Sequence, residues 1–357
     1  MAYSYDELEW HIRRLRCARK AGKLVFVLGA GINTEYEVPN WSQMLIRLTE
    51  KCGRLHPAQH TLTDEESKSF IDGVVLDPLL QAASLRGAYS SSEDWIRALK
   101  GILNVKETIL DDKDKPLGRI AKVVARQYSA DPQRHIAILT FNYDSLIEKA
   151  IELEMREEKV VAVSVSTAEE LARVRHRPGI FVYHLHGSLE NEKSEIVLDA
   201  YTYVRILAAP ANHWSWSCMN TFLFQKDAGV MFIGLSLLDP SLRLLLTHAA
   251  ENGTPLSAIF IGNPLGAPVP AKEGDVMPSP IGKPLAKALT APVPAKEGDA
   301  RPSPIGKPLA KALTAAWLKH DVQRLFDNLL EELSLVPYHV TEWSEVGPLI
   351  DRVGEDD

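Results

Sequence analysis

Short apolar runs alternate with longer amphipathic stretches through most of the first 263 residues. The runs are rich in β-branched side chains and have few polar positions, which is typical of strands buried on both faces of a parallel sheet. They predict strands at 24–28, 136–140, 160–165, 181–183, 230–233 and 258–261, a short strand at 196–198 and a last one at 336–340. Helical periodicity predicts helices at 4–20, 41–51, 119–130, from 145, around 218–225, from 240 and at 317–333. Asp239 is expected to cap the helix that begins at Pro240.

This alternation predicts an α/β fold with an open, doubly wound (Rossmann-like) parallel sheet. Between residues 53 and 113 the sequence is polar and helix-forming, which predicts a helical insertion beside the sheet. We therefore divide the chain into an N-terminal helix, an α/β domain with this insertion, a Pro/Ala-rich loop, and a C-terminal region with a helix, a strand and an acidic tail. The boundaries are 1–22, 23–263, 264–315 and 316–357.

The Pro/Ala-rich loop holds a tandem repeat of 24 residues, 267–290 and 291–314. The copies differ only at Val276/Ala300 and Met277/Arg301. Two copies are too few for a solenoid, which needs about three or more units to bury a core. The composition predicts an extended or disordered surface loop, and a docking segment for a partner is the alternative.

Composition narrows the class of protein. The 357 residues are 45% apolar and 24% charged, as in an ordinary globular protein. The net charge of −7, with scattered Lys and Arg, gives no support for direct nucleic-acid binding. No apolar run reaches the roughly 20 residues of a membrane helix, and the first 20 residues are too charged for a secretory signal. Three distant cysteines, Cys17, Cys52 and Cys218, predict neither a disulfide framework nor a zinc cluster, and fit a reducing cytoplasm.

Polar residues and glycines follow five of the predicted strands. The segments are Gly29-Ala30-Gly31 with Asn33 close behind, Thr140-Phe141-Asn142-Tyr143-Asp144, His184-Leu185-His186-Gly187, Gly234-Leu235-Ser236 and Gly262-Asn263. Each alone has a structural explanation as a turn, a cap or a buried histidine. Parallel strands end at one edge, however, so all five are expected together where such sheets bind ligands. They would supply phosphate-binding backbone, a carboxamide, a carboxylate and an imidazole, which suits a dinucleotide whose glycosidic bond is attacked.

These segments resemble the sirtuin-fold family, and more closely the prokaryotic sirtuin-like NAD hydrolases of anti-phage defence. The similar stretches are GAGIN with VPNW, TFNYD, HLHGS, and FIGLSLLDPSLR followed by IGN, within residues 23–263. Three positions differ from the family pattern: Val38 replaces a glycine, Asn40 an aspartate and Phe141 a glutamine. The paired CxxC zinc module of the deacylases is absent, which counts against protein deacylation.

The resemblance implies NAD⁺ as substrate, no metal, and a role for each matched residue. Asn142 and His186 would be catalytic, with Asn142 holding the ribose hydroxyls or water and His186 acting as general base. Residues Gly29, Ala30, Gly31, Asn33, Trp41, Asp144, Gly234, Ser236 and Asn263 would bind the dinucleotide. Asp144 would accept a hydrogen bond from the amide group of nicotinamide, and Trp41 would cover the nicotinamide ring. His186 is preferred to His184 because Gly187 beside it leaves room for a ligand, and both catalytic residues are expected at exposed strand ends.

The resemblance leads to an NAD⁺ glycohydrolase that forms nicotinamide and ADP-ribose, as an abortive-infection effector of anti-phage defence in the cytoplasm. A zinc-free deacylase or ADP-ribosyltransferase is the enzymatic alternative. A module that senses NAD or ADP-ribose without turnover is the alternative of another class. A homo-oligomer is expected, with a hexameric ATPase of the HerA class as a further partner. The apolar faces of the N-terminal helix and the 53–113 insertion are either contact surfaces for these partners or ordinary core.

Deleting one repeat copy, residues 291–314, should leave NAD⁺ cleavage and the melting temperature nearly unchanged. The copies have no hydrophobic periodicity, and the entropy of closing a loop grows only slowly with its length. Thermal denaturation and a nicotinamide-release assay of the shortened chain check this. A large fall in melting temperature would show that the repeat is packed structure.

Overall fold

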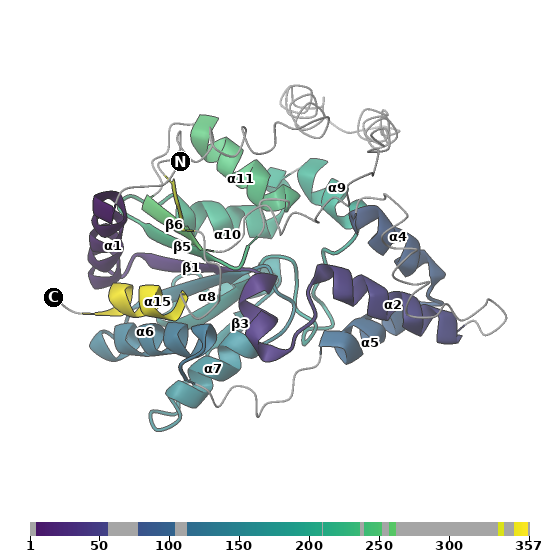
Figure 1. Ribbon diagram of the computed structural model, residues 1–357, viewed down its shortest axis with the longest axis horizontal. Coiled ribbons are helices and arrows are strands. Elements are labelled where there is room, and N and C mark those ends of the chain that lie inside the picture. Colours follow the sequence, from purple (N-terminus) through teal and green to yellow (C-terminus); the bar gives the residue numbers. More distant parts are fainter. Residues whose placement is uncertain are drawn as a thin grey trace, which may run out of the picture.

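The computed structural model describes residues 5–55, 78–103, 113–208, 210–235, 239–251, 257–261, 335–338 and 346–355. The predicted helix at 317–333, the tandem repeat, Ser236 and Asn263 lie outside these residues. Within them, a single parallel sheet is flanked by helices on both faces, and a group of helices lies beside it (Figure 1). The predicted doubly wound parallel α/β fold is therefore confirmed.

The sheet has seven strands in the order β3-β4-β2-β1-β5-β6-β7, and every pairing is parallel. Their bounds are β1 Leu24–Leu28, β2 His135–Thr140, β3 Val163–Val165, β4 Gly179–His184, β5 Gly229–Ile233, β6 Ser257–Ile261 and β7 Leu335–Tyr338. The central strand is β1, with β2 on one side and β5 on the other. The chain thus builds outward in both directions from β1, and ligands of such sheets bind at this reversal, beyond the carboxyl ends of the strands.

The helices follow the strands as the alternating pattern predicts. Their bounds are α1 Tyr5–Lys20, α2 Trp41–Leu55, α4 Pro78–Ala88, α5 Ser92–Leu103, α6 Pro116–Ala130, α7 Leu146–Glu154, α8 Ala168–Val174, α9 Ala200–Ala208, α10 Trp214–Leu223, α11 Pro240–Glu251 and α15 Val346–Gly354, with the 3-10 helices η1 Ala30–Tyr36 and η3 Pro210–Asn212. Asp239 caps α11, accepting a hydrogen bond from the Leu242 amide at 2.9 Å, and Pro240 is the first helical residue, as predicted.

Alternate residues of each strand enter two separate cores. Phe26, Ile138 and Val182 face one core, with residues of α1, α2, α5, α6, α7 and α15. Val27, Leu139 and Phe232 face the other, with residues of α8, α10 and α11. Burial on both faces explains why the strands are almost entirely apolar in sequence. It also leaves the strand ends as the place where polar groups gather.

The apolar faces of α1 and α5 belong to the first core. Ile12 and Leu15 of α1, and Trp95 and Leu99 of α5, are each no more than 2% exposed. Of the two explanations offered for these faces, the structure therefore supports ordinary core. Helices α2, α4 and α5 lie together at one side of the molecule (Figure 1). Helices α4 and α5, with the last residues of α2, form most of the described part of the insertion predicted at 53–113.

Three elements differ from prediction. Val197 and Leu198 are buried and Ile196 is partly buried, but residues 196–198 form no strand, so that prediction was wrong. Strand β3 is shorter than the predicted 160–165, and Val161 and Val163 are exposed beside this edge. Helix α15 was not predicted, since this part of the chain was assigned to an acidic tail, although its buried residues Val346, Leu349, Ile350 and Val353 repeat with helical spacing.

Candidate functional site

Two glycine loops meet where β1 and β5 end. The Gly31 amide donates to the Gly234 carbonyl at 2.8 Å, and the Gly29 amide donates to the Ile233 carbonyl at 2.9 Å. A Cβ on Gly29 would lie 2.5 Å from the Gly234 oxygen, and one on Gly234 would lie 2.3 Å from the Ile32 nitrogen. Gly234 also has a φ of +69°, which side chains rarely adopt. Both positions therefore require glycine so that the two loops can touch.

This contact changes what the first loop can offer to a phosphate. The sequence predicts that these glycines allow a ligand to approach the backbone. In the structure, Gly29 instead lies against the backbone of Gly234 and Leu235. The Gly31 amide is likewise bonded within the protein. Ala30, at the start of η1, is exposed. The exposed side of this loop is consequently its remaining surface for a dinucleotide.

Three of the expected residues are joined by hydrogen bonds at this edge. The Asn142 side chain donates to the Gly29 carbonyl at 3.3 Å. The Asn33 side chain donates to the Asp144 carboxylate at 2.7 Å, and the other Asp144 oxygen accepts the Leu146 amide at the start of α7. The segment after β2 is thus bonded to the glycine loop through two carboxamides. Burial raises the pKa of Asp144 to about 6, against the hydrogen bond from Leu146, which lowers it.

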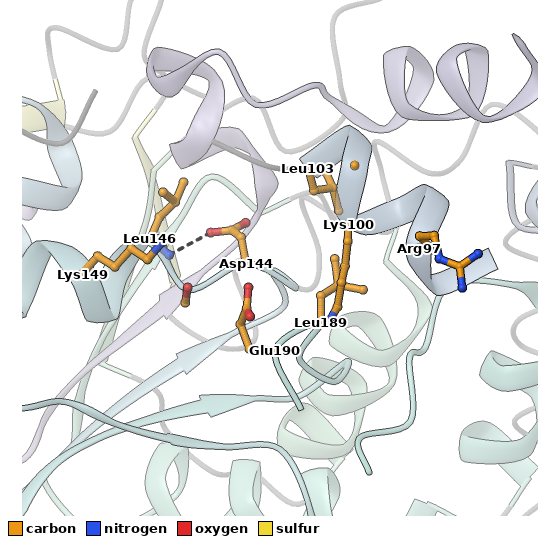
Figure 2. A pocket seen from close by; sticks show the side chains of 10 residues that line it. Arg97, Lys100, Leu103, Asp144, Leu146, Lys149, Leu189 and Glu190 are labelled. Atoms are coloured by element: carbon orange, nitrogen blue, oxygen red, sulfur yellow. Dashed lines mark hydrogen bonds between the residues drawn. The ribbon is translucent and has the colours of Figure 1, made fainter. Parts of the chain in front are cut away.

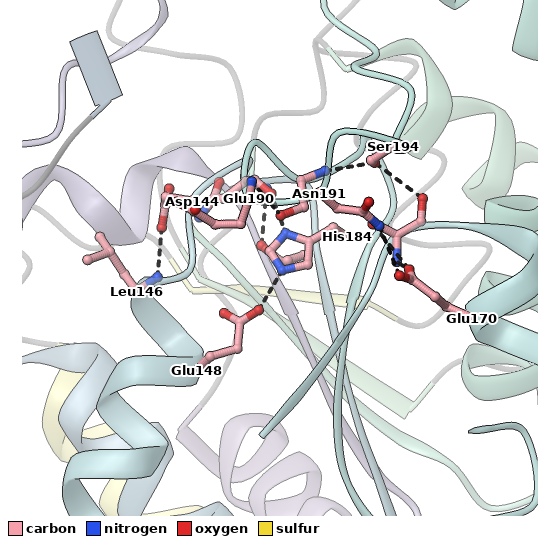
Figure 3. Close-up of polar contacts among 12 residues, drawn as sticks. Asp144, Leu146, Glu148, Glu170, His184, Glu190, Asn191 and Ser194 are labelled. Carbon is pink, nitrogen blue, oxygen red and sulfur yellow. Dashed lines mark hydrogen bonds and ion pairs between the residues drawn. The ribbon is translucent and has the colours of Figure 1, made fainter. Parts of the chain in front are cut away.

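His184 is a structural residue. It is completely buried, its Nε2 lies 2.6 Å from Glu148 of α7, and its Nδ1 lies 3.0 Å from the Asn142 carbonyl oxygen (Figure 3). Burial by itself lowers the pKa of His184, but the Glu148 carboxylate opposes this and the pKa is raised overall. A charged His184 donates both ring protons, one to each oxygen. It therefore fixes the backbone at Asn142 and has no nitrogen left for a substrate.

His186 has different surroundings. It is 3% exposed. Its ring makes edge-to-face contacts with the rings of Phe141 and of Tyr203 on α9, with centroid distances of 4.7 and 5.2 Å. Its Nδ1 lies 3.3 Å from the Tyr203 hydroxyl, and its Nε2 lies 3.9 Å from Asp239. Among the described residues no group is within hydrogen-bonding distance of Nε2. Burial lowers the pKa of His186, and Asp239 opposes this shift.

Two expectations about His186 need correction. Asn142 and His186 lie at strand ends, but they are 8% and 3% exposed, so the expectation of exposed positions was wrong. Gly187 does not leave room for a ligand. Its φ is +90°, and a Cβ there would lie 2.1 Å from the Glu195 carbonyl oxygen, so the returning backbone fills that space. His186 is distinguished from His184 by its free Nε2 and not by a neighbouring gap.

The loop after His186 is held by α8. Glu170 accepts from the Ser166 amide at 2.7 Å and from the Asn191 side chain at 2.9 Å, and Ser194 lies 3.0 Å from the Ser188 amide (Figure 3). The Val197 amide adds a bond to the His186 carbonyl at 2.9 Å. These bonds fix the backbone at His186 and in the segment that follows it, which favours a defined position of the ring.

A pocket of about 440 Å³ lies between α5 and the start of α7 (Figure 2). Of the expected site residues, Asp144 lines it. Cationic and anionic side chains share its wall with three leucines, a glycine and a serine; the lining residues are Arg97, Lys100, Gly101, Leu103, Asp144, Ser145, Leu146, Lys149, Leu189 and Glu190. The helical insertion therefore forms one wall of a pocket whose other wall is the carboxyl edge of the sheet.

Trp41 is not joined to these groups by any recorded contact. It begins α2, packs against the first core, and has a buried indole N–H without a hydrogen-bond partner among the described residues. Ser236 and Asn263 lie outside the described part of the chain. In that part, no group of three or more His, Cys, Asp or Glu side chains could hold a metal ion, and no helix is long and apolar enough to cross a membrane.

Sequence reasoning missed Glu148, Tyr203 and the second role of Asp239. Glu148 is a carboxylate among the buried residues of α7, which is a usable sign of a buried ion pair. Asp239 was recognised as a helix cap, and its contact with Tyr203 at 2.7 Å joins segments 36 residues apart. Nothing local to either residue indicates that contact.

Comparison with protein families gives one match. Residues 136–265 match the family model of the SIR2-like domain. The match begins in β2 and ends just after β6, and includes Asn142, Asp144, His186 and Gly234. It supports a sirtuin-like family and an NAD-related function, and it is compatible with an NAD-dependent enzyme. No curated protein shows significant similarity to the chain.

His184→Ala should lower the free energy of unfolding by about 3–5 kcal/mol, because it leaves Glu148 buried and unpaired. Denaturant unfolding measures this. The double variant Glu148→Gln/His184→Gln should recover part of the loss, since both buried charges are gone. His135→Gln is the matched control, because this histidine is hydrogen-bonded to a backbone oxygen and to Tyr183 but to no carboxylate. It should lower the free energy of unfolding by about 1 kcal/mol.

The contribution of His184 to the free energy of unfolding also depends on pH. Its pKa is raised in the folded state above the ordinary value of about 6.5. The stabilisation is thus fully present below about pH 6.5 and is lost as pH rises through the folded-state pKa. The difference in stability between wild type and His184→Ala should shrink over that range. A difference that does not change with pH would contradict a charged His184.

Proposed function

We propose that this SIR2-like protein is an NAD⁺ glycohydrolase, which cleaves NAD⁺ into nicotinamide and ADP-ribose. The observation that carries the proposal is the Nε2 of His186, buried at the carboxyl edge of the sheet with no hydrogen-bond partner among the described residues. An imidazole nitrogen whose electron pair is not used by another group of the protein suits a general base. Asn142 and Asp144 at the neighbouring strand end supply the polar groups that a nicotinamide riboside requires.

Each residue has a proposed part in the reaction. Asn142, bonded to Gly29, positions the ribose hydroxyls or the attacking water. Asp144, at the wall of the 440 Å³ pocket, accepts the nicotinamide amide. With a pKa of about 6 it is mostly ionised at neutral pH and is able to accept. We assign binding of the pyrophosphate to the exposed side of the loop with Gly29, Ala30, Gly31 and Asn33 and to Gly234. Trp41 is assigned to the nicotinamide. Ser236 and Asn263, outside the described residues, are assigned to a phosphate and to the adenosine ribose by the resemblance alone.

The reaction transfers a glycosyl group to water. The bond between C1′ and the nicotinamide nitrogen breaks, and its electron pair leaves with neutral nicotinamide. The cation-like ribose is captured by a water oxygen, which forms the new bond to C1′. The proton of that water passes to Nε2 of His186, which later releases it to solvent. Charge on the ribose develops beside buried carboxylates, in surroundings where electrostatic stabilisation is stronger than in water.

A nicotinamide-release assay separates this function from its alternatives. Purified protein with NAD⁺ should give free nicotinamide and ADP-ribose in equal amounts. Binding without product would indicate a sensor. Product that forms only with an acyl-lysine peptide would indicate a deacylase, and transfer of ADP-ribose to protein a transferase. The assay is repeated with the neighbouring gene product, so that an enzyme requiring activation is not mistaken for a sensor.

Asn142→Ala and His186→Ala should each reduce NAD⁺ cleavage by at least ~10²-fold, the scale of general-base catalysis. Because both positions are buried, thermal denaturation accompanies each assay and His186→Gln provides a variant of closer volume. Asn220→Ala on α10 and His135→Gln are matched controls with hydrogen bonds elsewhere. Wild-type turnover in a folded Asn142 or His186 variant would refute the site.

We further propose that the enzyme is an abortive-infection effector of bacterial anti-phage defence and acts in the cytoplasm. Unregulated cleavage of NAD⁺ would remove a cofactor on which the cell depends, so activity requires control. Control through a homo-oligomer, with a HerA-class hexameric ATPase as a further partner, fits a chain whose described residues contain no separate sensor fold.

Light scattering coupled to size-exclusion chromatography tests control by assembly. We expect an oligomer whose NAD⁺ cleavage rises with assembly or on addition of the ATPase. The specific activity is measured across a dilution series that spans dissociation. A monomer with full activity alone would exclude this form of control and leave the assigned reaction unaffected.

A further inference from the structure

His186 is one member of a buried group of three side chains from separate elements. His186 follows β4, Tyr203 lies on α9, and Asp239 caps α11. The Tyr203 hydroxyl is 2.7 Å from Asp239 Oδ2 and 3.3 Å from His186 Nδ1. The Asp239 side chain is 17% exposed and that of His186 is 4% exposed. The three groups therefore interact with little screening by solvent.

The distances decide where the protons are. A tyrosine hydroxyl has one proton, and the shorter contact to a carboxylate is the stronger hydrogen bond. Tyr203 thus donates to Asp239, and its oxygen can only accept from His186. The Nδ1 atom of neutral His186 must then carry the imidazole proton. Its Nε2 atom is left with the free electron pair, at the position where no described residue donates or accepts.

We propose that Tyr203 and Asp239 are positioning residues that hold neutral His186 as the Nδ1–H tautomer and so keep Nε2 available as the base. The catalytic importance of this tautomer rests on the proposed function, whereas the tautomer itself does not. Asp239 lies 3.9 Å from Nε2, so it also stabilises the positive charge that His186 gains when Nε2 accepts a proton.

Other groups near His186 do not replace this pair. Phe141 presents an aromatic ring, which neither donates nor accepts a proton. His213, at the start of α10, interacts with His186 electrostatically, and a positive charge on His213 would disfavour one on His186. Arg205 of α9 acts on His213 in the same sense. Asp239 is therefore the group that favours protonation of His186.

Asp239→Asn gives a sharp test because α11 keeps its cap. The Leu242 amide requires an oxygen at Oδ1, so the new NH₂ group takes the place of Oδ2. That group cannot accept from Tyr203. The tyrosine proton then turns to Nδ1 of His186, and the imidazole proton moves to Nε2. The variant should fold, yet have its free electron pair on the wrong nitrogen. The same logic of a carboxylate fixing a catalytic tautomer is known from serine proteases.

The tautomer is measured by NMR of protein labelled with ¹⁵N-histidine, and His186→Gln identifies the His186 signals. We expect a protonated Nδ1 and an unprotonated Nε2 in wild type, the reverse in Asp239→Asn, and a mixture in Tyr203→Phe, where Nδ1–H has lost its acceptor. An Nε2–H tautomer in wild type, or an unchanged one in folded Asp239→Asn, would overturn the proposal. If Asp239→Asn does not fold, Tyr203→Phe decides in the same way, with an unchanged tautomer as the contrary result.

Kinetics provide the second readout. Asp239→Asn should lower kcat for NAD⁺ cleavage by at least ~10²-fold with little change in KM, and residual activity should show a shifted pH profile. Tyr183→Phe is the matched control, since it removes a buried tyrosine–histidine hydrogen bond of 2.9 Å to His135. It should leave kcat and the pH profile unchanged. A wild type that does not cleave NAD⁺ would refute the proposed function, while the NMR result would still decide the tautomer.

Discussion

The backbone contact between Gly29 and Gly234 is the constraint on which the candidate site depends. It brings the ends of β1 and β5 within hydrogen-bonding distance, on either side of the point where the sheet reverses its direction of growth. Gly29 then presents its carbonyl to Asn142, and Asn33, one turn further on, reaches Asp144. Two loops that a larger side chain would separate are thus fixed against the end of β2. The glycines act on the ligand site through its geometry, because much of their own polar surface is already bonded within the protein.

The local sequence pattern predicted most of the fold but less of the candidate site. Apolar runs located the strands because burial on both faces leaves nearly continuous hydrophobic sequence, and parallel order placed their polar ends at one edge. The same pattern misled at residues 196–198, which are apolar and pack against the core although they belong to no strand. The reading of Gly187 failed for a related reason. A glycine can indicate that another group approaches the backbone closely, but the sequence does not show whether that group is a ligand or another part of the chain, as it is at Gly187.

The two histidines of the HLHGS segment show how burial separates similar residues. His184 has a carboxylate and a carbonyl oxygen within hydrogen-bonding distance of its two nitrogens, and the carboxylate raises its pKa. His186 has a hydroxyl on one nitrogen, a carboxylate just beyond hydrogen-bonding distance of the other, and a lowered pKa. One supports the backbone of Asn142 and the other retains an unused electron pair. The sequence around the two histidines does not indicate this difference in role, because their partners Glu148, Tyr203 and Asp239 come from three other elements.

Helix α15 packs against α1 and α6, and β7 pairs with β6, so residues near both ends of the sequence complete one face of the same sheet (Figure 1). During synthesis on the ribosome, α1 emerges well before its neighbour α15, which lies more than 300 residues further along the chain. Contacts of such separation form slowly, and the apolar surface that awaits them is prone to association in the meantime. We therefore expect the nascent chain to depend on chaperones until α15 has been made, because until then the surfaces of α1 and α6 that α15 contacts stay uncovered.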